Sequence, residues 1–275
     1  MAIPPDILRI ASMLDDADEN VGVNLLAQLL ERADELEDLP AVLQESADPV
    51  VRRRAHQLQS ALTMRRRRRE FHRRLTEDAN PDLPAGLEEL HLLWFDRDSA
   101  AALHTAVTEF AADFRSGGTA SLEEVEFFLR RRNFLPEPES TIVPESYCLG
   151  TILDRRAGAG SVLLALAAEL ADGAGLRVVR TLDEFGLVDG RGGILLGGGA
   201  WRLCPAPDIK ALEFWNSRMI LRYVAATLLS CAVNSDSYRY VMSIAQALGG
   251  DDSEHVFDRF PYPFRATAPE HENVD

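Results

Sequence analysis

The sequence contains little cysteine, and none of it is arranged in pairs. Among the 275 residues, the three cysteines Cys148, Cys204 and Cys231 show no Cys-x-x-Cys spacing, and the six histidines show no zinc-binding spacing. These features argue against a disulfide framework and a structural metal site, and they favour a reducing compartment. We expect neither a metal nor another cofactor.

Long apolar runs are also missing. No stretch approaches the roughly 20 apolar residues that a membrane-spanning helix requires. The first residues lack a basic segment followed by an apolar one, which is the pattern of a secretory signal. The sequence therefore predicts a cytoplasmic protein that does not contact a membrane.

Lysine is almost absent, because Lys210 is the only one. This preference for arginine is typical of bacteria with GC-rich genomes. The formal net charge is −15, so the chain as a whole repels phosphate backbones, and nucleic-acid binding would need a segregated basic face. The one candidate is a run of five arginines, Arg65, Arg66, Arg67, Arg68 and Arg69.

This arginine run cannot form a single basic face. At about 100° per residue, five consecutive side chains surround a helix completely. Arg68 falls in line with the apolar residues Met64 and Phe71, so we expect it to need a carboxylate partner. The preferred interpretation is a salt-bridged structural helix. An anionic protein partner and nucleic acid are the alternatives, and nucleic acid is the less expected because only one aromatic residue lies among the basic ones.

Residues 1–118 carry helical periodicity and are expected to form a helical region. Asp48 before Pro49 predicts a helix start, because the carboxylate accepts free N–H groups and proline lacks one. Residues 39–43 together with residues 48–55 resemble one HEAT repeat, which predicts a helical pair packed on the next domain or, alternatively, a binding groove. The expected helices cover residues 7–14, 21–36, 40–45, 49–75, 87–95 and 98–115, with a linker at 80–84.

Residues 119–250 are expected to form a second domain, followed by an acidic, proline-containing tail at 251–275. Ser121 and Glu124 form a capping box at the start of a helix, and the glycines at 158 and 160 predict a tight turn before an apolar, buried helix. The fold class is therefore α+β and mostly α, with a small antiparallel sheet. We expect helices at 149–156, 161–171, from 209 or 212 to 231, and at 236–248, and strands at 177–182, 192–196 and 200–204.

One segment of this second domain resembles a known family. It runs Leu149-x-x-Ile-Leu-Asp154-Arg155-Arg156-x-Gly158-x-Gly160-Ser-Val-Leu, and after the apolar helix comes Gly-Leu-Arg-Val at 175–178. The pattern is similar to the transglutaminase-like domain of the SirB1 family, over roughly residues 120–248. The resemblance implies a nucleophilic cysteine at the start of the buried helix and a histidine and an aspartate on the following strands.

The sequence departs from the family at all three catalytic positions. Ser161 stands at the helix start, Phe185 or Gly186 stands where the histidine is expected, and Cys204 lies at the third position. No histidine lies between His104 and His255. Loss of the nucleophile or base typically costs about 10⁶ in turnover. The match is therefore that of a degenerate domain.

These observations favour a non-catalytic protein, or pseudoenzyme, that acts as a bacterial interaction or scaffold protein with an unidentified protein partner. The alternative is a hydrolase or amide-transfer enzyme that uses Ser161, Cys148 or Cys204 as its nucleophile. Nucleic-acid binding through residues 65–74 is the third hypothesis. The glycine clusters at 190–193 and 197–199 are expected to be hairpin turns, because no Lys-Ser/Thr pair or helix follows them.

Overall fold

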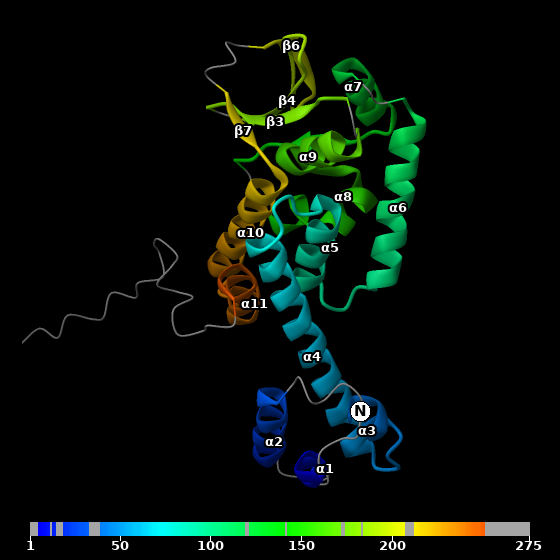
Figure 1. Ribbon diagram of the computed structural model, residues 1–275, viewed down its shortest axis with the longest axis vertical. Helices are drawn as coiled ribbons and strands as arrows, with labels where there is room; N and C mark the ends of the chain where they lie inside the picture. Colours follow the sequence, from blue (N-terminus) through cyan, green and yellow to red (C-terminus); the bar gives the residue numbers. More distant parts are fainter. Residues whose placement is uncertain are drawn as a thin grey trace, which may run out of the picture. The chain divides into compact units, whose positions relative to one another are not determined.

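The protein is α+β and mostly helical, with a small antiparallel sheet, which confirms the predicted fold class (Figure 1). A computed structural model describes residues 5–11, 13–14, 19–32, 39–118, 121–140, 142–171, 174–182, 184–206 and 212–250, so the expected tail at 251–275 lies outside the described residues. The chain divides into two compact units, residues 1–67 and 68–275. This boundary falls within a helix, whereas the sequence suggested a boundary near residue 118.

The first unit is formed by short helices around one apolar core. Asp48 accepts the N–H of Val50 at 2.7 Å, so the predicted start of the long helix is confirmed. The buried side chains include Leu29 on the second helix, Leu39 on the third and Leu58 on the fourth. The helices are α1 (Pro5–Ala11), α2 (Glu19–Glu31), α3 (Leu39–Gln44) and α4 (Pro49–Thr76), of which α4 continues into the second unit.

The second unit contains the remaining helices. The linker predicted at 80–84 is wrong in part: α5 already begins at Leu83, because Asp82 accepts the N–H of Ala85 at 2.9 Å and proline is tolerated in a first turn. Ser121 caps α7 as predicted. The helices are α5 (Leu83–Trp94), α6 (Ala100–Ser116), α7 (Leu122–Arg131), the 3-10 turn η2 (Pro144–Ser146), α8 (Leu149–Arg155), α9 (Gly160–Leu170), α10 (Ser217–Asn234) and α11 (Tyr238–Gly249).

A five-stranded antiparallel sheet lies within the second unit, in the order β6-β5-β4-β3-β7. The last strand corrects the sequence prediction of a helix from residue 209 or 212. It pairs with β3, and α10 begins only at Ser217, where Asn216 accepts the N–H of Met219 at 2.9 Å. The strands are β3 (Arg177–Arg180), β4 (Phe185–Val188), β5 (Gly193–Leu196), β6 (Arg202–Pro205) and β7 (Glu213–Trp215).

A second, two-stranded sheet stands where a turn was predicted. Strand β1 (Leu135–Glu137) pairs in parallel with β2 (Ala157–Ala159), so the residues around Gly158 are extended, and α9 follows directly at Gly160. The predicted tight turn is therefore wrong. The hydrogen bond from the Leu135 N–H to the Arg156 carbonyl, at 2.8 Å, begins this pairing.

Helix α9 is buried on nearly all sides, as the sequence predicts. It packs against strands β3 and β4 on one side and against α5, α6 and α10 on the others. Figure 1 shows it lying beneath the sheet, with α10 leading away from β7. The N-terminal end of α9 is consequently surrounded by protein.

Candidate functional site

The N-terminal end of α9 is closed by a carboxylate from the chain itself. Ser161 is completely buried, and its main-chain N–H donates a hydrogen bond to Oε1 of Glu139 at 2.8 Å. The N-terminus of a helix carries unpaired N–H groups and a partial positive charge, so a carboxylate is favourable there. Glu139 occupies the place that an incoming anion or a reaction intermediate would need.

Two tyrosines hold the other oxygen of this carboxylate. Oε2 of Glu139 accepts hydrogen bonds from the hydroxyl of Tyr147 at 3.0 Å and from that of Tyr223, on α10, at 2.6 Å. Burial raises the pKa of Tyr223 to about 12, and the hydrogen bond to Glu139 contributes to the shift. Burial, with the nearby Glu139 charge, also raises the pKa of Tyr147. Both phenols are therefore neutral donors near pH 7.

An aromatic cluster covers the Tyr223 side of this carboxylate. Phe185 lies 5.1 Å from Tyr223 and 4.9 Å from Trp215 between ring centroids. The guanidinium of Arg180 lies 5.6 Å from the centroid of Phe185. Phe185 stands where the family resemblance implies a histidine, and a phenyl ring can neither accept nor deliver a proton. The neighbouring Gly186 is buried beneath the side chain of Ile194.

Cys204 is not part of this cluster. In the sheet register, Cys204 pairs with Ile194, whereas Gly186 pairs with Leu196 and Leu196 in turn pairs with Arg202. Cys204 therefore lies toward the far end of the strands, with its Sγ 3.9 Å from the carbonyl of Ile194. Arg202 is the β6 residue level with Gly186, and it forms an ion pair with Glu184.

Among the described residues, the Ser161 hydroxyl has no partner that could activate it. Oγ of Ser161 is buried and makes no hydrogen bond with the described residues. A serine nucleophile needs a base within about 2.6–3.2 Å. Glu139 is the nearby base by position, but its oxygens accept the hydrogen bonds from the Ser161 N–H and the two tyrosines.

A histidine–aspartate pair, which the sequence analysis missed, lies elsewhere in this unit. Nε2 of His91, on α5, lies 3.0 Å from Oδ2 of Asp98, and the ring contacts α8 at Gly150. His91 is only 3% exposed; burial lowers its pKa, and Asp98 offsets part of that shift. Its Nδ1 is buried and has no hydrogen-bond partner among the described residues, so no thiol is joined to it.

The other two cysteines are buried in the same unit. Burial raises the pKa of Cys148, which precedes α8, well above its ordinary value, and the nearby charge of Glu145 adds to the shift. Burial raises the pKa of Cys231 to about 11. A reactive cysteine has a lowered pKa and solvent access, so these two thiols have the opposite properties.

The motif arginines and glycines have structural partners. Arg155 forms an ion pair with Glu137 at 2.8 Å, and Arg156 ends α8 in the left-handed conformation with φ 54°. Asp154, Arg155 and Arg156 are all exposed. Neither Gly158 nor Gly160 has a positive φ. Both are required by close approach: a Cβ on Gly158 would lie 2.6 Å from the Ile152 side chain, and one on Gly160 would overlap the carbonyl oxygen of Gly197.

The arginine run of α4 does not present one open basic surface. Arg66 is exposed, whereas the other four side chains are half-buried. Arg65 donates to the carbonyl of Leu30, and Arg67 approaches the sulfur of Met64 at 3.9 Å. A carboxylate partner for Arg68 stays a prediction.

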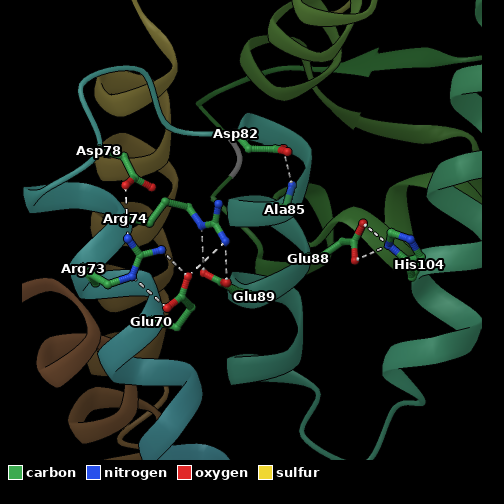
Figure 2. A network of polar contacts seen from close by, with 9 residues as sticks. All are labelled: Glu70, Arg73, Arg74, Asp78, Asp82, Ala85, Glu88, Glu89 and His104. Carbon is green, nitrogen blue, oxygen red and sulfur yellow. Dashed lines mark hydrogen bonds and ion pairs between the residues drawn. The ribbon is translucent and has the colours of Figure 1, made fainter.

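The basic residues that follow this run are engaged by acids. Arg74 forms an ion pair with Glu89 of α5 at 3.0 Å, and Arg73 forms one with Glu70 at 2.6 Å. Figure 2 shows both arginines among these carboxylates, and also shows Glu88 of α5 facing His104 of α6. The charges at this end of α4 therefore join α4 to α5.

Comparison with known proteins adds no assignment. The chain matches no protein-family model, no curated protein and no solved structure. Within the described residues, no three His, Cys, Asp or Glu side chains gather in a way that could hold a metal ion. None of the helices in that part of the chain is both long and apolar enough to cross a membrane.

Proposed function

We propose that the protein is a non-catalytic, SirB1-like bacterial protein that acts in the cytoplasm as an interaction or scaffold protein for another protein. The observation that carries this proposal is the closed N-terminal end of α9. Ser161 is fully buried there, and Glu139, held by Tyr147 and Tyr223, accepts its N–H. Under the proposal, a substrate carbonyl would have to displace this carboxylate to reach the N–H of Ser161.

The composition of the site supports the same proposal. A transglutaminase-like reaction needs a nucleophile with a lowered pKa and a base beside it. The helix start has a serine without a base, the next strand has Phe185, and the β6 residue at that level is Arg202 in an ion pair. Binding is the activity that this degenerate domain retains under the proposal.

Labelling of the intact chain at neutral pH tests the absence of a reactive nucleophile. We expect iodoacetamide to modify the half-buried Cys204 no faster than a free cysteine, and to modify Cys148 and Cys231 only after unfolding. A fluorophosphonate should leave Ser161 unmodified. The urea-unfolded chain, in which all three thiols react, is the control. Rapid modification of Cys148, Cys204 or Ser161 in the folded chain would contradict the proposal and favour the enzyme hypothesis.

A second measurement addresses the arginine run. Under the proposal, the chain binds duplex DNA or RNA no more tightly than its Arg66→Glu/Arg67→Glu variant does. Binding that weakens steeply with salt and is abolished in this variant would contradict the proposal and establish the nucleic-acid hypothesis, because phosphate contacts release counterions.

A further inference from the structure

A cavity of about 390 Å³ lies beside the second half of α9. Its walls come from α9, β3, β7 and the beginnings of α5 and α10. Ala165, Val178 and Ile220 give it an apolar interior, and Trp215 adds a flat aromatic surface. Small-molecule sites in proteins have this size and are mostly apolar with a few polar groups.

The lining of this cavity contains a cationic side chain, that of Arg177. The guanidinium of Arg177 lies 4.2 Å from the ring centroid of Phe214, and both residues line the cavity. Arg177 is exposed and forms no ion pair with any described residue. Stacking covers one face of the guanidinium and leaves its in-plane N–H groups available. Those groups match a carboxylate, which they can bind through two parallel hydrogen bonds.

The first turn of α10 also lines this cavity. Trp215 lines it too, but its Nε1 is fully buried and is not exposed to the cavity. Ser217 begins α10, and the side-chain oxygen of Asn216 is already used by Met219. The first N–H groups of a helix have no partner within it.

The cavity lining offers a ligand little that could accept a hydrogen bond. Its acidic side chain, Glu169, already accepts a hydrogen bond from the Ser217 hydroxyl at 3.2 Å. The lining therefore offers a cation and the N-terminal end of α10 next to apolar walls. Its polar groups suit a ligand with an anionic acceptor at one end.

We propose that this cavity binds a small organic carboxylate with a planar apolar body. The carboxylate binds Arg177 beside the N-terminal end of α10, while the body packs on Ala165, Val178 and Ile220. The proposal does not depend on the absence of catalysis at Ser161, because Ser161, Glu139, Tyr147 and Tyr223 do not line this cavity.

Two probes of nearly equal shape, one charged and one neutral, distinguish the contribution of the carboxylate to binding from that of the apolar body. With the full chain in isothermal titration calorimetry or ligand-observed NMR, we expect 3-phenylpropionate to bind with a dissociation constant on the order of 1 mM or tighter. The neutral 3-phenylpropionamide should bind about 10-fold more weakly, because it lacks the charge-assisted hydrogen bonds to Arg177. Arg177→Gln should remove this difference and leave amide binding unchanged.

Two further variants test whether the effect is specific to Arg177 and whether the probes bind in the cavity. Arg191→Gln changes an exposed arginine in the β4–β5 turn that does not line the cavity, and it should bind both probes as the unmodified chain does. Ala168→Phe fills the cavity and should abolish binding of both probes, while circular dichroism checks that it is folded. The proposal is overturned if neither probe binds below about 10 mM, if both bind equally, or if Arg177→Gln has no effect. The outcome of the thiol labelling does not depend on these binding measurements. The proposed function and the proposed carboxylate site can therefore fail independently.

Discussion

The main-chain N–H of Ser161 donates a 2.8 Å hydrogen bond to the side chain of Glu139, so the N-terminal end of the most buried helix is capped by a residue that precedes it by 22 positions. Glu139 lies beyond strand β1, whose pairing with β2 brings the two segments together. The same carboxylate accepts hydrogen bonds from Tyr147 and Tyr223. The N-terminal end of α9 is thus closed by tertiary contacts within the chain.

Removal of this carboxylate should destabilise the fold. Glu139→Ala leaves the Ser161 N–H and the hydroxyls of Tyr147 and Tyr223 without their acceptor, which should lower the free energy of unfolding by about 2–3 kcal/mol in urea denaturation. Glu145→Ala is the matched control, because that acid is exposed. It should change the free energy by less than about 0.5 kcal/mol. Equal effects of the two variants would mean that the cap contributes nothing specific.

The charge of Glu139 should also be visible in the titration of Tyr223. Burial raises the pKa of Tyr223 to about 12, and Glu139 adds to this because its negative charge disfavours a phenolate beside it. In Glu139→Gln, the pKa should fall, yet stay above the ordinary value of 10.0 because burial remains. The titration of Tyr223 is obtained by recording tyrosinate absorbance for Glu139→Gln and for Glu139→Gln/Tyr223→Phe and subtracting the second curve from the first. An unchanged pKa would show that the two side chains are not in contact.

The two arginines at the end of α4 should differ in their effect on stability. In Arg74→Ala, Glu89 remains largely buried without its cation, so the free energy of unfolding at neutral pH should fall by about 1–3 kcal/mol. Arg73 pairs with Glu70 at the surface, with its side chain 44% exposed, so Arg73→Ala should leave the melting temperature essentially unchanged (Figure 2).

The pH dependence of Arg74→Ala provides a further check. Burial raises the pKa of Glu89, so in the folded state this carboxyl takes up a proton at a higher pH than in the unfolded chain. Part of the stability lost in Arg74→Ala should therefore return as the pH is lowered and Glu89 becomes neutral. A loss that is the same at all pH values would indicate a packing effect of the arginine stem.

Acidification should destabilise the second unit through His91. Burial lowers the folded-state pKa of His91 below 6.5, so the unfolded state binds more protons in that range. The stability that the folded state has with a neutral His91 is therefore fully present above pH 6.5 and is lost as the pH falls below that value. In His91→Gln, the free energy of unfolding should depend less on pH between about pH 5 and 7. His104→Gln removes a ring that is 72% exposed and should keep the original slope. A similar slope in all three proteins would exclude His91 as the cause.

Local capping signals predicted two helix starts, whereas the caps at Asp82 and Asn216 were overlooked and tertiary partners were not visible in the sequence. Asp48 before Pro49 and Ser121 before Glu124 each act within a few residues, so their outcome follows from local chemistry. Strand β7 forms because β3 lies beside it; Phe214 and Trp215 favour a strand, but nothing within 213–215 indicates which strand is the partner.

The candidate site was only partly predictable for the same reason. Ser161 and Phe185 were identified by their positions after a motif, and the aromatic cluster around Tyr223 brings the two regions together. Glu139 was missed because it lies in a proline-containing segment without periodicity, where only the fold reveals its partners. The pair of His91 and Asp98 is close in sequence, and its spacing across the end of α5 was the one signal that could have found it.

The reason for glycine at position 160 can be tested directly. A Cβ on Gly160 would overlap the main-chain carbonyl of Gly197, which cannot move without shifting the loop after β5, whereas a Cβ on Gly190 meets nothing within 4 Å. Neither residue has a positive φ, so backbone conformation does not distinguish them. Gly160→Ala should therefore lower the free energy of unfolding by about 1–3 kcal/mol, as overpacking against a rigid neighbour does. Gly190→Ala should be neutral or slightly stabilising, because it reduces the freedom of the unfolded chain. If urea denaturation gave the two variants the same midpoint, the close approach of α9 to the β5 loop would be refuted, and with it the tight closure of the helix end around Ser161.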